Sequence, residues 1–531
     1  MNKVLKIFMV LAGVAIIFTS CTKDLDTIPL DDDVTTAATV YDDPQAYTQV
    51  LAKLYAGHAV SGQEGPAGNG DISGIDEGFG QYLRGWWYHQ QLPTDEAVIG
   101  WNDQTIKDFH WQTWGSSDVF VAAMYYRIFY QISICNEYIR ETSEGKLDER
   151  GVSGDLRAQV QTFRAEARFL RALSYWHAMD LFGNVPFVTE QDGVGAFFPE
   201  QIQRAELFNY IESELLDIED DLNAPGAIYA RADQGAAWTL LAKIYLNAEV
   251  YTGTPRYAEC ATYCQQVIDA GYSLHPNYEH LFLADNDQNN PEQIFSVAFD
   301  GLKTQTFGGT NFIIHAAIGG EMVPSNYGFS GGWGGTRTTA ALVDKFPDET
   351  GDTDGRAMFF TEGQTKEIVD IGDFTNGYAI TKWKNVKSTG GGGQSQDYPD
   401  TDFPYFRLAD VYLMYAEAAA QGAADVGMAV DYVNMIRERS YNGDDFNNDY
   451  AVDAGDLTLD FILDERAREL YWECHRRTDL VRHGKLTGGE YLWPWKGNVQ
   501  EGTSTDEKFN LFPIPASDVG ANPNLTQNPG Y

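Results

Sequence analysis

Apolar residues recur every three or four positions over long stretches of this chain. The longest such stretch is 155–182, where the spacing predicts a helix with one buried face. Gly183 follows as a helix stop, and Pro186 prevents the helix from continuing. The same spacing predicts six further helices, at 206–222, 236–248, 256–270, 407–420, 426–439 and 457–473. The pattern therefore predicts a mainly α-helical protein with little β-structure.

Several of these predicted helices follow one another as antiparallel pairs. Pairs of about 34 residues with small residues at the helix crossing are typical of tetratricopeptide repeats. Alanines such as Ala237 and Ala261 permit a close approach of the paired helices. The consensus signature of the repeat is absent, so we predict degenerate repeats. The expected fold is a tetratricopeptide-like helical-repeat scaffold that carries long, loop-rich insertions.

Three long segments interrupt the helical pattern. Residues 58–118 and 300–336 alternate glycines with aromatic residues, and residues 347–403 contain a run of glycines. Loops of this length in a compact protein are usually functional or disordered, and the aromatic content argues against disorder. We therefore predict that 58–118 and 300–336 are non-helical and form the functional surface. The third segment is predicted to be a flexible surface excursion.

The first 20 residues predict export from the cytoplasm. Two early lysines precede an apolar run at 7–18, and small residues lead to Cys21. The apolar run is too short for a membrane span, which needs about 20 residues. The order is typical of a bacterial lipoprotein signal, with Cys21 as the lipidated residue. The alternative is an ordinary secretory signal with an incidental cysteine.

The rest of the chain is predicted to be one folded body behind a tether. Residues 21–40 are acidic and are expected to be a solvated link. Residues 41–531 are expected to form a single domain. No second apolar segment approaches spanning length, so the predicted contact with a membrane is the lipid anchor alone.

The charge of the chain restricts its ligands. The formal net charge is −40, and no run of Lys or Arg offsets it. Such a charge repels nucleic acids and other polyanions. A neutral ligand is therefore expected, and no nucleic-acid partner.

Three segments carry a family resemblance. Residues 163–190 contain FRAEARFLRALSYWHAMDLFGNVPFVTE, residues 462–486 contain ILDERARELYWECHRRTDLVRHGKL, and residues 512–531 end the chain with FPIPASDVGANPNLTQNPGY. Together with the lipoprotein start, they resemble the SusD/RagB family of outer-membrane glycan-binding lipoproteins. The resemblance implies a tetratricopeptide-like scaffold with a loop-rich binding surface. It also implies exposure at the cell surface and a SusC-like TonB-dependent transporter as partner.

The resemblance also implies a binding site. Stretches at 76–101, 300–309, 332–333 and 491–497 are similar to the starch-binding founder of the family. The matching residues are an aromatic trio with three polar neighbours, namely Trp101, Phe307, Trp333, Asp76, Arg84 and Gln104. Phe307 stands where the founder has a tyrosine, and Gln104 stands where it has an asparagine.

These residue types suit a neutral sugar. Flat patches of C–H bonds pack on aromatic faces, carboxylates accept hydroxyl hydrogen bonds, and guanidinium groups donate in a fixed fork. A curved trio of rings favours a helical α-glucan such as starch, glycogen or maltooligosaccharides. The alternatives are another neutral glycan, such as laminarin or a fructan, or a tetratricopeptide scaffold that binds a peptide.

Catalysis is not expected. Among 77 Asp and Glu, some pair will lie at a glycosidase-like separation by chance, and Asp95-Glu96 is expected to make turn and loop hydrogen bonds. Residues 328–332 spell GFSGG, which matches the nucleophile elbow of hydrolases only formally. That motif needs a following helix, whereas more glycines follow Ser330. We predict a binding protein and no enzyme.

No cofactor is expected, although a structural calcium ion is an open alternative at two acidic loops. Asp445, Asn447 and Asp449 occupy positions 1, 3 and 5 of an EF-hand-like loop, but Tyr450 replaces the usual glycine. Asp285 and Asp287 belong to the second loop. The missing turn residue favours a solvated acidic loop over a metal site.

Overall fold

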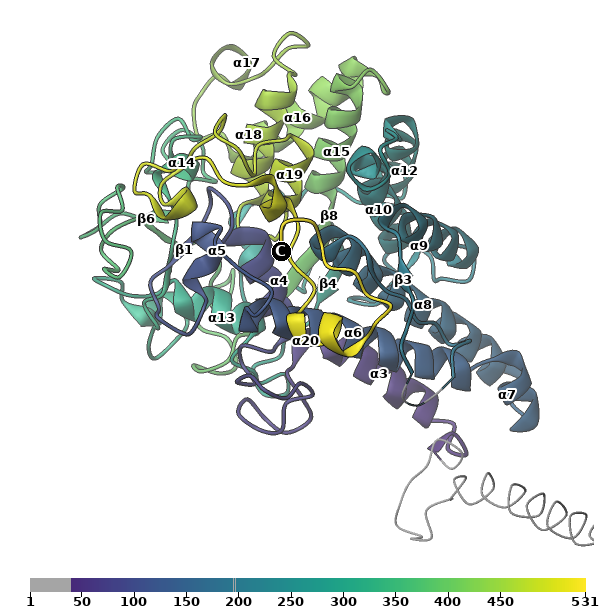
Figure 1. Ribbon diagram of the computed structural model, residues 1–531. Coiled ribbons are helices and arrows are strands. Elements are labelled where there is room, and N and C mark those ends of the chain that lie inside the picture. Colours follow the sequence, from purple (N-terminus) through teal and green to yellow (C-terminus); the bar gives the residue numbers. More distant parts are fainter. Residues whose placement is uncertain (1–39, 194, 196) are drawn as a thin grey trace, which may run out of the picture. The chain divides into compact units, whose positions relative to one another are not determined.

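The computed structural model describes residues 40–193, 195 and 197–531 (Figure 1). The predicted signal peptide, Cys21 and all of the tether except Val40 lie outside these residues. The chain divides into two units, 1–49 and 50–531, and every feature discussed below belongs to the second unit, except the first four residues of α3 (Ala46–Ala59). Over the described ranges, no helix combines the length and the apolar character needed to cross a membrane.

The described chain is mainly helical. The longer helices are α3 (Ala46–Ala59), α4 (Tyr82–Gln91), α6 (Val119–Glu141), α8 (Gly154–Phe182), α9 (Arg204–Ile218), α10 (Gln234–Leu246), α12 (Tyr257–Asp269), α13 (Gly309–Ala316), α15 (Leu408–Ala420), α16 (Val426–Ser440) and α18 (Leu459–Leu470). The shorter helices are α5 (Lys107–Trp111), α7 (Glu144–Glu149), α11 (Ala248–Thr252), α14 (Ala340–Val343), α17 (Phe446–Asp449), α19 (Arg476–Arg482) and α20 (Ala516–Ala521). Single 3-10 turns are η1 (Glu279–Phe282), η2 (Pro324–Tyr327), η3 (Lys496–Asn498) and η4 (Glu507–Asn510).

Strands are short and pair two by two. The antiparallel pairs are β1 (Val98–Ile99) with β5 (Thr336–Arg337), β2 (Val185–Pro186) with β3 (Gln201–Ile202), β4 (Gln293–Val297) with β8 (Phe403–Arg407), and β6 (Phe359–Phe360) with β7 (Ala379–Ile380). The predicted fold class, mainly helical with little β-structure, is confirmed.

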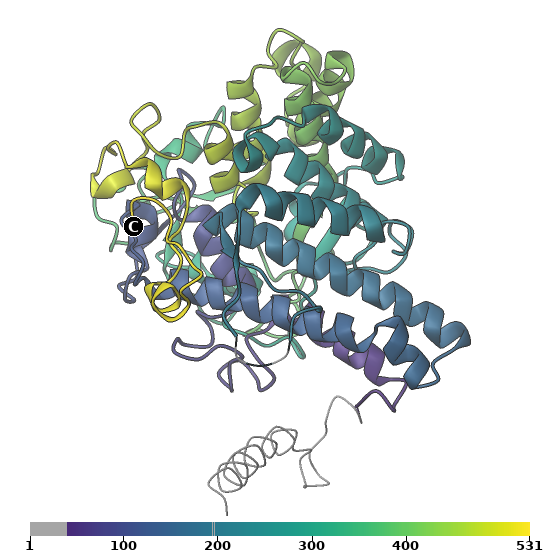
Figure 2. The ribbon, with the colours of Figure 1, turned by 45° about the vertical axis from the view of Figure 1, so that its right-hand side comes forward.

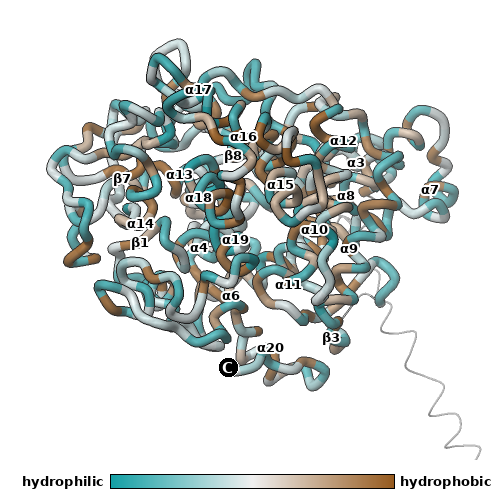
Figure 3. The backbone as a smooth tube through the Cα atoms, turned by 90° about the horizontal axis from the view of Figure 1, so that it is seen from above, coloured by the Kyte–Doolittle hydropathy of each residue, from teal (hydrophilic) through white to brown (hydrophobic). Residues whose placement is uncertain are grey.

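The seven predicted helices are all present. They stack in sequence order, with α8 between α6 and α9, α10 on α12, and α15 on α12, α16 and α18 (Figure 2). Along α9 and α12, the buried apolar residues recur every three or four positions, with polar residues between them (Figure 3). The last predicted helix ends at Leu470 instead of residue 473, because Trp472 and Cys474 take a positive φ that ends helical structure. Helix α6 was not among the predictions.

The prediction of non-helical insertions is wrong. Helix α4 and the short helix α5 lie inside 58–118, and α13 lies inside 300–336. Every residue of α4 and of α13 is buried. Helices α4 and α13 have only 10 and 8 residues, so each is too short to show a recurring apolar spacing among the surrounding glycines and aromatic residues. Both helices carry residues of the candidate site described below.

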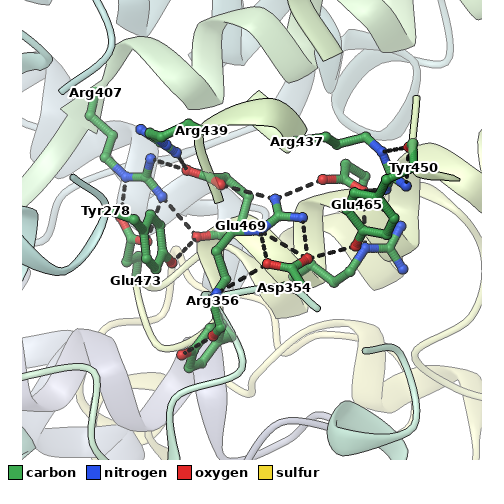
Figure 4. Close-up of polar contacts among 12 residues, drawn as sticks. Tyr278, Asp354, Arg356, Arg407, Arg437, Arg439, Tyr450, Glu465, Glu469 and Glu473 are labelled. Atoms are coloured by element: carbon green, nitrogen blue, oxygen red, sulfur yellow. Dashed lines mark hydrogen bonds and ion pairs between the residues drawn. The ribbon is translucent and has the colours of Figure 1, made fainter. Parts of the chain in front are cut away.

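The sequence motif at 462–486 builds a buried network of charges (Figure 4). Glu465 and Glu469 on α18, together with Glu473, face arginines from other elements. The ion pairs include Arg356 with Glu465 at 2.7 Å, Arg407 with Glu469 at 2.5 Å, Arg407 with Glu473 at 2.6 Å, Arg437 with Glu465 at 2.7 Å and Arg439 with Glu469 at 2.5 Å. The network ties α16, α18 and β8 to the insertion that begins at residue 347.

This network predicts acid sensitivity. Burial alone would raise the pKa of Glu469, but Arg439, Arg407 and Arg356 outweigh it and hold the pKa at about 2. Asp95 behaves in the same way as Glu469. Burial would raise its pKa, but Arg476 outweighs this effect and lowers the pKa of Asp95 to about 2. The unfolded chain takes up these protons first, near pH 4. The contribution of these two carboxyls to stability is therefore expected to be full above about pH 5 and to fall steadily toward pH 2, by about 2 kcal/mol or more for each carboxyl.

Urea unfolding at pH 7, 5 and 3.5, followed by circular dichroism, measures how steeply the unfolding free energy changes with pH. In Glu469→Gln the slope between pH 5 and 3.5 should be shallower than in the wild-type protein, because one of the carboxyls with a lowered pKa is gone. Equal unfolding free energies of the wild-type protein at pH 5 and pH 3.5 would contradict the assignment.

Candidate functional site

Two tryptophans lie side by side because a two-residue sheet brings their segments together. Strand β1 pairs with β5, and Gly100 N donates to Gly335 O at 2.8 Å just beyond the pair. Trp101 follows β1, and Trp333 precedes β5. Their ring centroids are 6.3 Å apart, and Trp101 Nε1 donates to Trp333 O at 3.2 Å. Both rings are partly exposed.

The segment of Trp333 rests on the C-terminal end of α13. Trp333 N donates to His315 O at 2.8 Å, and Gly335 N donates to Ala316 O at 2.7 Å. These bonds satisfy carbonyls that a helix end otherwise leaves without a partner. The His315 imidazole stacks on the Trp333 indole at 4.7 Å and 15°. Burial lowers the pKa of His315 to about 4, so this supporting ring is neutral at pH 7.

Phe307 is held through Gln81, the residue before α4. Gln81 Oε1 accepts from Arg84 N at 2.7 Å and from Gly309 N at 2.8 Å, which joins the starts of α4 and α13. Arg84 Nη1 donates to Phe307 O at 2.8 Å. The Phe307 ring then lies 6.4 Å from the Trp333 ring, at an angle of 61°.

Arg84 lies beneath the rings. Its guanidinium carbon is 4.3 Å from the Phe79 ring centroid, 4.6 Å from that of Phe312 and 5.8 Å from that of Trp101. Its Nε donates to the Tyr88 hydroxyl at 2.6 Å. Its Nη2 has no hydrogen-bond partner within the described part of the chain, so one charged donor is left for a ligand.

The structure places Asp76 beside Phe307 and Arg84. It does not place Gln104 there. Asp76 is exposed, and its Oδ1 accepts from Gly78 N at 3.0 Å. A Cβ on Gly78 would lie 2.9 Å from Phe307 Cβ, 3.3 Å from Arg84 Nη1 and 3.2 Å from Asp76 Oδ1, which shows that the three converge. Gln104 is exposed with φ 43°, and no contact among the described residues joins it to the other five.

A fourth ring extends the row. Tyr398, in the insertion predicted to be a flexible excursion, lies 6.2 Å from Phe307 at 45°. The four partly exposed rings of Trp101, Trp333, Phe307 and Tyr398, here called the aromatic arc, are thus separated by 6.3, 6.4 and 6.2 Å in turn. No sequence signal indicated Tyr398, because it is a lone aromatic in a polar, glycine-rich segment.

Comparison with known proteins places the chain in a family. Residues 360–531 match the SusD family. The starch-binding protein SusD of Bacteroides thetaiotaomicron is 36% identical over 97% of this chain and 96% of that protein. The chain belongs to the SusD family.

Solved structures with the SusD-family fold have the same architecture as this chain. A SusD superfamily protein from Bacteroides vulgatus has a TM-score of 0.70 at 20% identity and covers 92% of this chain and 99% of its own. The surface glycan-binding protein A of Bacteroides thetaiotaomicron, solved in complex with laminarihexaose, has a TM-score of 0.68 at 18% identity. It covers 91% of this chain and 99% of its own. At these identities the likeness shows the fold alone.

Asp95 and Glu96 have a structural role in this SusD-family chain. They were expected to make loop hydrogen bonds, but both are buried. Arg476 donates to Asp95 through Nε at 2.7 Å and through Nη2 at 2.6 Å. Glu96 Oε2 accepts from Trp472 N at 3.1 Å, and burial raises the pKa of Glu96 to about 8. Both acids therefore anchor the segment that leads into β1 and Trp101.

The calcium candidates of this SusD-family protein have other partners. Asp445 caps α17 by accepting from Asn448 N at 3.3 Å, and Asp449 accepts from the Tyr441 hydroxyl. Asp285 accepts twice from Ser388. The described residues contain no group of three or more His, Cys, Asp or Glu arranged to hold a metal ion. Calcium at Asp285, Asp287, Asp445, Asn447 or Asp449 stays a prediction.

Proposed function

We propose that this protein captures neutral oligosaccharides on the aromatic arc and performs no catalysis. The observation that carries the proposal is the row of four partly exposed rings with Arg84 and Asp76 at one side. Apolar ring faces receive the C–H patches of sugars, while Arg84 Nη2 donates to hydroxyl oxygens and the Asp76 carboxylate accepts from hydroxyl groups. The negative net charge and the absence of a cationic cluster at these residues favour a neutral ligand.

The inclination of the rings favours an α-glucan. Successive planes in the arc are tilted by 48°, 61° and 45°, so the surface turns from ring to ring. A helical α-1,4-glucan turns in the same way, whereas a flat cellulose-like chain would stack on one ring at a time. The starch-binding activity of the 36% identical SusD of Bacteroides thetaiotaomicron supports this ligand class.

A second candidate is a β-glucan of the laminarin type. It is favoured by the laminarihexaose complex of surface glycan-binding protein A, which shares the fold. A fructan is a third candidate among the neutral glycans. A peptide-binding tetratricopeptide scaffold would leave the aromatic arc without a role.

The proposal extends to the cellular setting. Lipidation at Cys21 would hold the protein on the outer membrane, facing the cell exterior. There it would deliver captured oligosaccharides to a SusC-like TonB-dependent transporter. Family membership and the lipoprotein-like start support both steps.

Isothermal titration calorimetry of residues 22–531 tests the ligand class. The panel is maltohexaose, laminarihexaose, a levan oligosaccharide and cellohexaose. Maltohexaose is expected to bind tightest and cellohexaose not at all. Preference for laminarihexaose would replace the α-glucan assignment and keep the site. Binding of no glycan would overturn the proposal, and glycan shortening during incubation would overturn its non-catalytic part.

One substitution should displace a ring of the arc without replacing it. A Cβ on Gly335 would lie 2.4 Å from Cε2 of Trp101, so Gly335→Ala must push the indole away from its hydrogen bond to Trp333 O. We expect about a tenfold loss of affinity for maltohexaose, equal to about 1.4 kcal/mol.

The matched control is Gly331→Ala, four residues earlier in the same segment. A Cβ at Gly331 meets no atom within 4 Å, so the affinity should stay within about twofold. Equal affinities of the two variants would show that the position of Trp101 does not matter for binding.

A further inference from the structure

Arg337, on β5, is a buried cation that bonds to carbonyl groups instead of carboxylates. It is 0% exposed, and its four hydrogen bonds to described residues all go to main-chain oxygens. Burial lowers the pKa of Arg337 to about 10, so the group stays charged at pH 7. Other fully buried arginines each form an ion pair with Asp or Glu, namely Arg127, Arg171, Arg356, Arg407, Arg476 and Arg477. Arg337 therefore has a different task from these arginines.

Three of the four carbonyls belong to residues 371–376, here called the backing loop. Arg337 Nη2 donates to Ile371 O at 2.6 Å and to Asp373 O at 2.9 Å. Its Nε donates to Asn376 O at 2.9 Å. The guanidinium is planar and holds its donors in a fixed fork, so the three carbonyls are fixed relative to one another. Arg337 thus determines the shape of the backing loop and its position on β5.

The fourth carbonyl belongs to the segment of Trp333. Arg337 Nη1 donates to Gly335 O at 3.1 Å, and the same oxygen accepts from Gly100 N at 2.8 Å. Gly100 directly precedes Trp101. A Cβ on Gly100 would lie 2.9 Å from Arg337 Nη1, which shows that the guanidinium lies against the main chain at this point. One cation therefore contacts the segments that carry both tryptophans of the aromatic arc.

The backing loop also packs on the segment of Trp333. Phe374, in the loop, is partly buried. A Cβ on Gly319 would lie 2.8 Å from Phe374 Cε1 and 2.9 Å from Gly334 Cα, and a Cβ on Gly334 would lie 3.7 Å from Phe374 Cδ2. Gly334 directly follows Trp333. The Phe374 ring therefore lies close to the main chain beside Trp333, where two glycines leave room for it.

We propose that Arg337 is a positioning residue for glycan binding, which holds Trp101 and Trp333 at their mutual distance and tilt without touching the ligand. It acts through Gly335 O and through the backing loop. Rings that are held in the binding geometry before the ligand arrives cost less ordering on binding, so their fixation raises affinity. The effect on affinity rests on the proposed function. The effect on the two tryptophan segments rests on the contacts of Arg337.

Arg337→Lys tests the effect on affinity. The variant keeps the charge, but a lysine ammonium does not reproduce the fork that reaches four carbonyls. Isothermal titration calorimetry should show about a tenfold weaker affinity for maltohexaose. In a Trp101→Ala background the same substitution should weaken the affinity by about threefold at most, because one of the rings that Arg337 positions is then absent. A general loss of structure would weaken binding equally in both backgrounds.

The matched control is Arg204→Lys. The Arg204 side chain also donates to main-chain carbonyls, Met179 O at 3.1 Å and Val250 O at 3.4 Å, and to no carboxylate among the described residues. Its partners belong to α8 and α11, and not to the segments of the arc. The affinity of this variant should therefore stay within about twofold of the wild type.

Phe374→Ala serves if Arg337→Lys does not fold. It removes a partly buried ring of the backing loop and leaves every carbonyl that Arg337 binds in place. We expect about a threefold loss of affinity for maltohexaose. An unchanged affinity would show that the backing loop does not position the arc.

Hydrogen exchange of the free protein tests the positioning without a ligand. Peptides that contain the amides of Gly100 and Gly335, measured by mass spectrometry, should exchange at least about fivefold faster in Arg337→Lys than in the wild type. Peptides of α15 should exchange at the same rate in both proteins. The control Arg204→Lys should leave the Gly100 and Gly335 peptides unchanged.

Three results overturn the positioning role. They are an affinity of Arg337→Lys within about twofold of the wild type, equal weakening with and without the Trp101 ring, and unchanged exchange at Gly100 and Gly335. Failure of the proposed function looks different, because the wild-type protein would then bind no glycan. Faster exchange at Gly100 and Gly335 in Arg337→Lys would in that case still support its control of the two segments.

Discussion

Trp333→Ala is expected to weaken the binding of maltohexaose by about 30-fold or more. Trp333 is an inner ring of the aromatic arc, with Trp101 at 6.3 Å on one side and Phe307 at 6.4 Å on the other. Truncation of a central aromatic at a binding surface commonly removes about 2 kcal/mol or more, and about 1.4 kcal/mol corresponds to tenfold in affinity. Calorimetry of the wild-type protein and the variant measures the difference.

Trp238→Ala is the control for this prediction. Trp238 is a partly buried tryptophan on α10, away from the arc, so its removal tests the loss of a large ring without the loss of a ligand contact. Its affinity should equal that of the wild-type protein. If Trp333→Ala stays within twofold of the wild type, the arc is not the binding site.

Glu469→Ala is expected to lower the free energy of unfolding by about 3–5 kcal/mol. Glu469 is fully buried and faces the guanidinium groups of Arg356, Arg407 and Arg439. Its removal leaves three buried cations with less counter-charge than they need. Burying an unpaired charge costs far more than the loss of the pair itself. Urea unfolding followed by circular dichroism at pH 7 measures the change.

Asp460→Ala breaks an ion pair of the same helix at the surface. Asp460 pairs with Lys485, and its side chain is 78% exposed. Exposed pairs contribute about 0–1 kcal/mol, so this variant should be nearly as stable as the wild type. Similar unfolding free energies for Glu469→Ala and Asp460→Ala would show that the buried network does not stabilise the fold.

The scaffold could be predicted from the sequence because its helices are long enough for apolar residues to recur every three or four positions over several turns. Helix α8 was predicted within one residue at its start and correctly at its end, where Gly183 takes φ 72°. Helices α4 and α13 could not be predicted in this way, because with 10 and 8 residues they are too short to show a recurring apolar spacing.

The site was predictable only through family resemblance, and not completely. The contact between Trp101 and Trp333 joins residues 232 positions apart through a two-residue sheet, which has no periodic signature. Tyr398 joins the arc from a segment without a recognisable motif. Conversely, the most recognisable motif, at 462–486, contributes the buried charges of the scaffold and no ring of the arc.

The rings of the arc are held by the backbones of their own segments. Trp333 and Gly335 bond to the end of α13 through their amides, and Phe307 bonds to Arg84 through its carbonyl. A different side chain at Trp333 or Phe307 would therefore leave the path of the main chain unchanged. During evolution, single substitutions in the arc can change ligand preference while the folded scaffold stays intact. Relatives with the same fold can therefore bind different ligands.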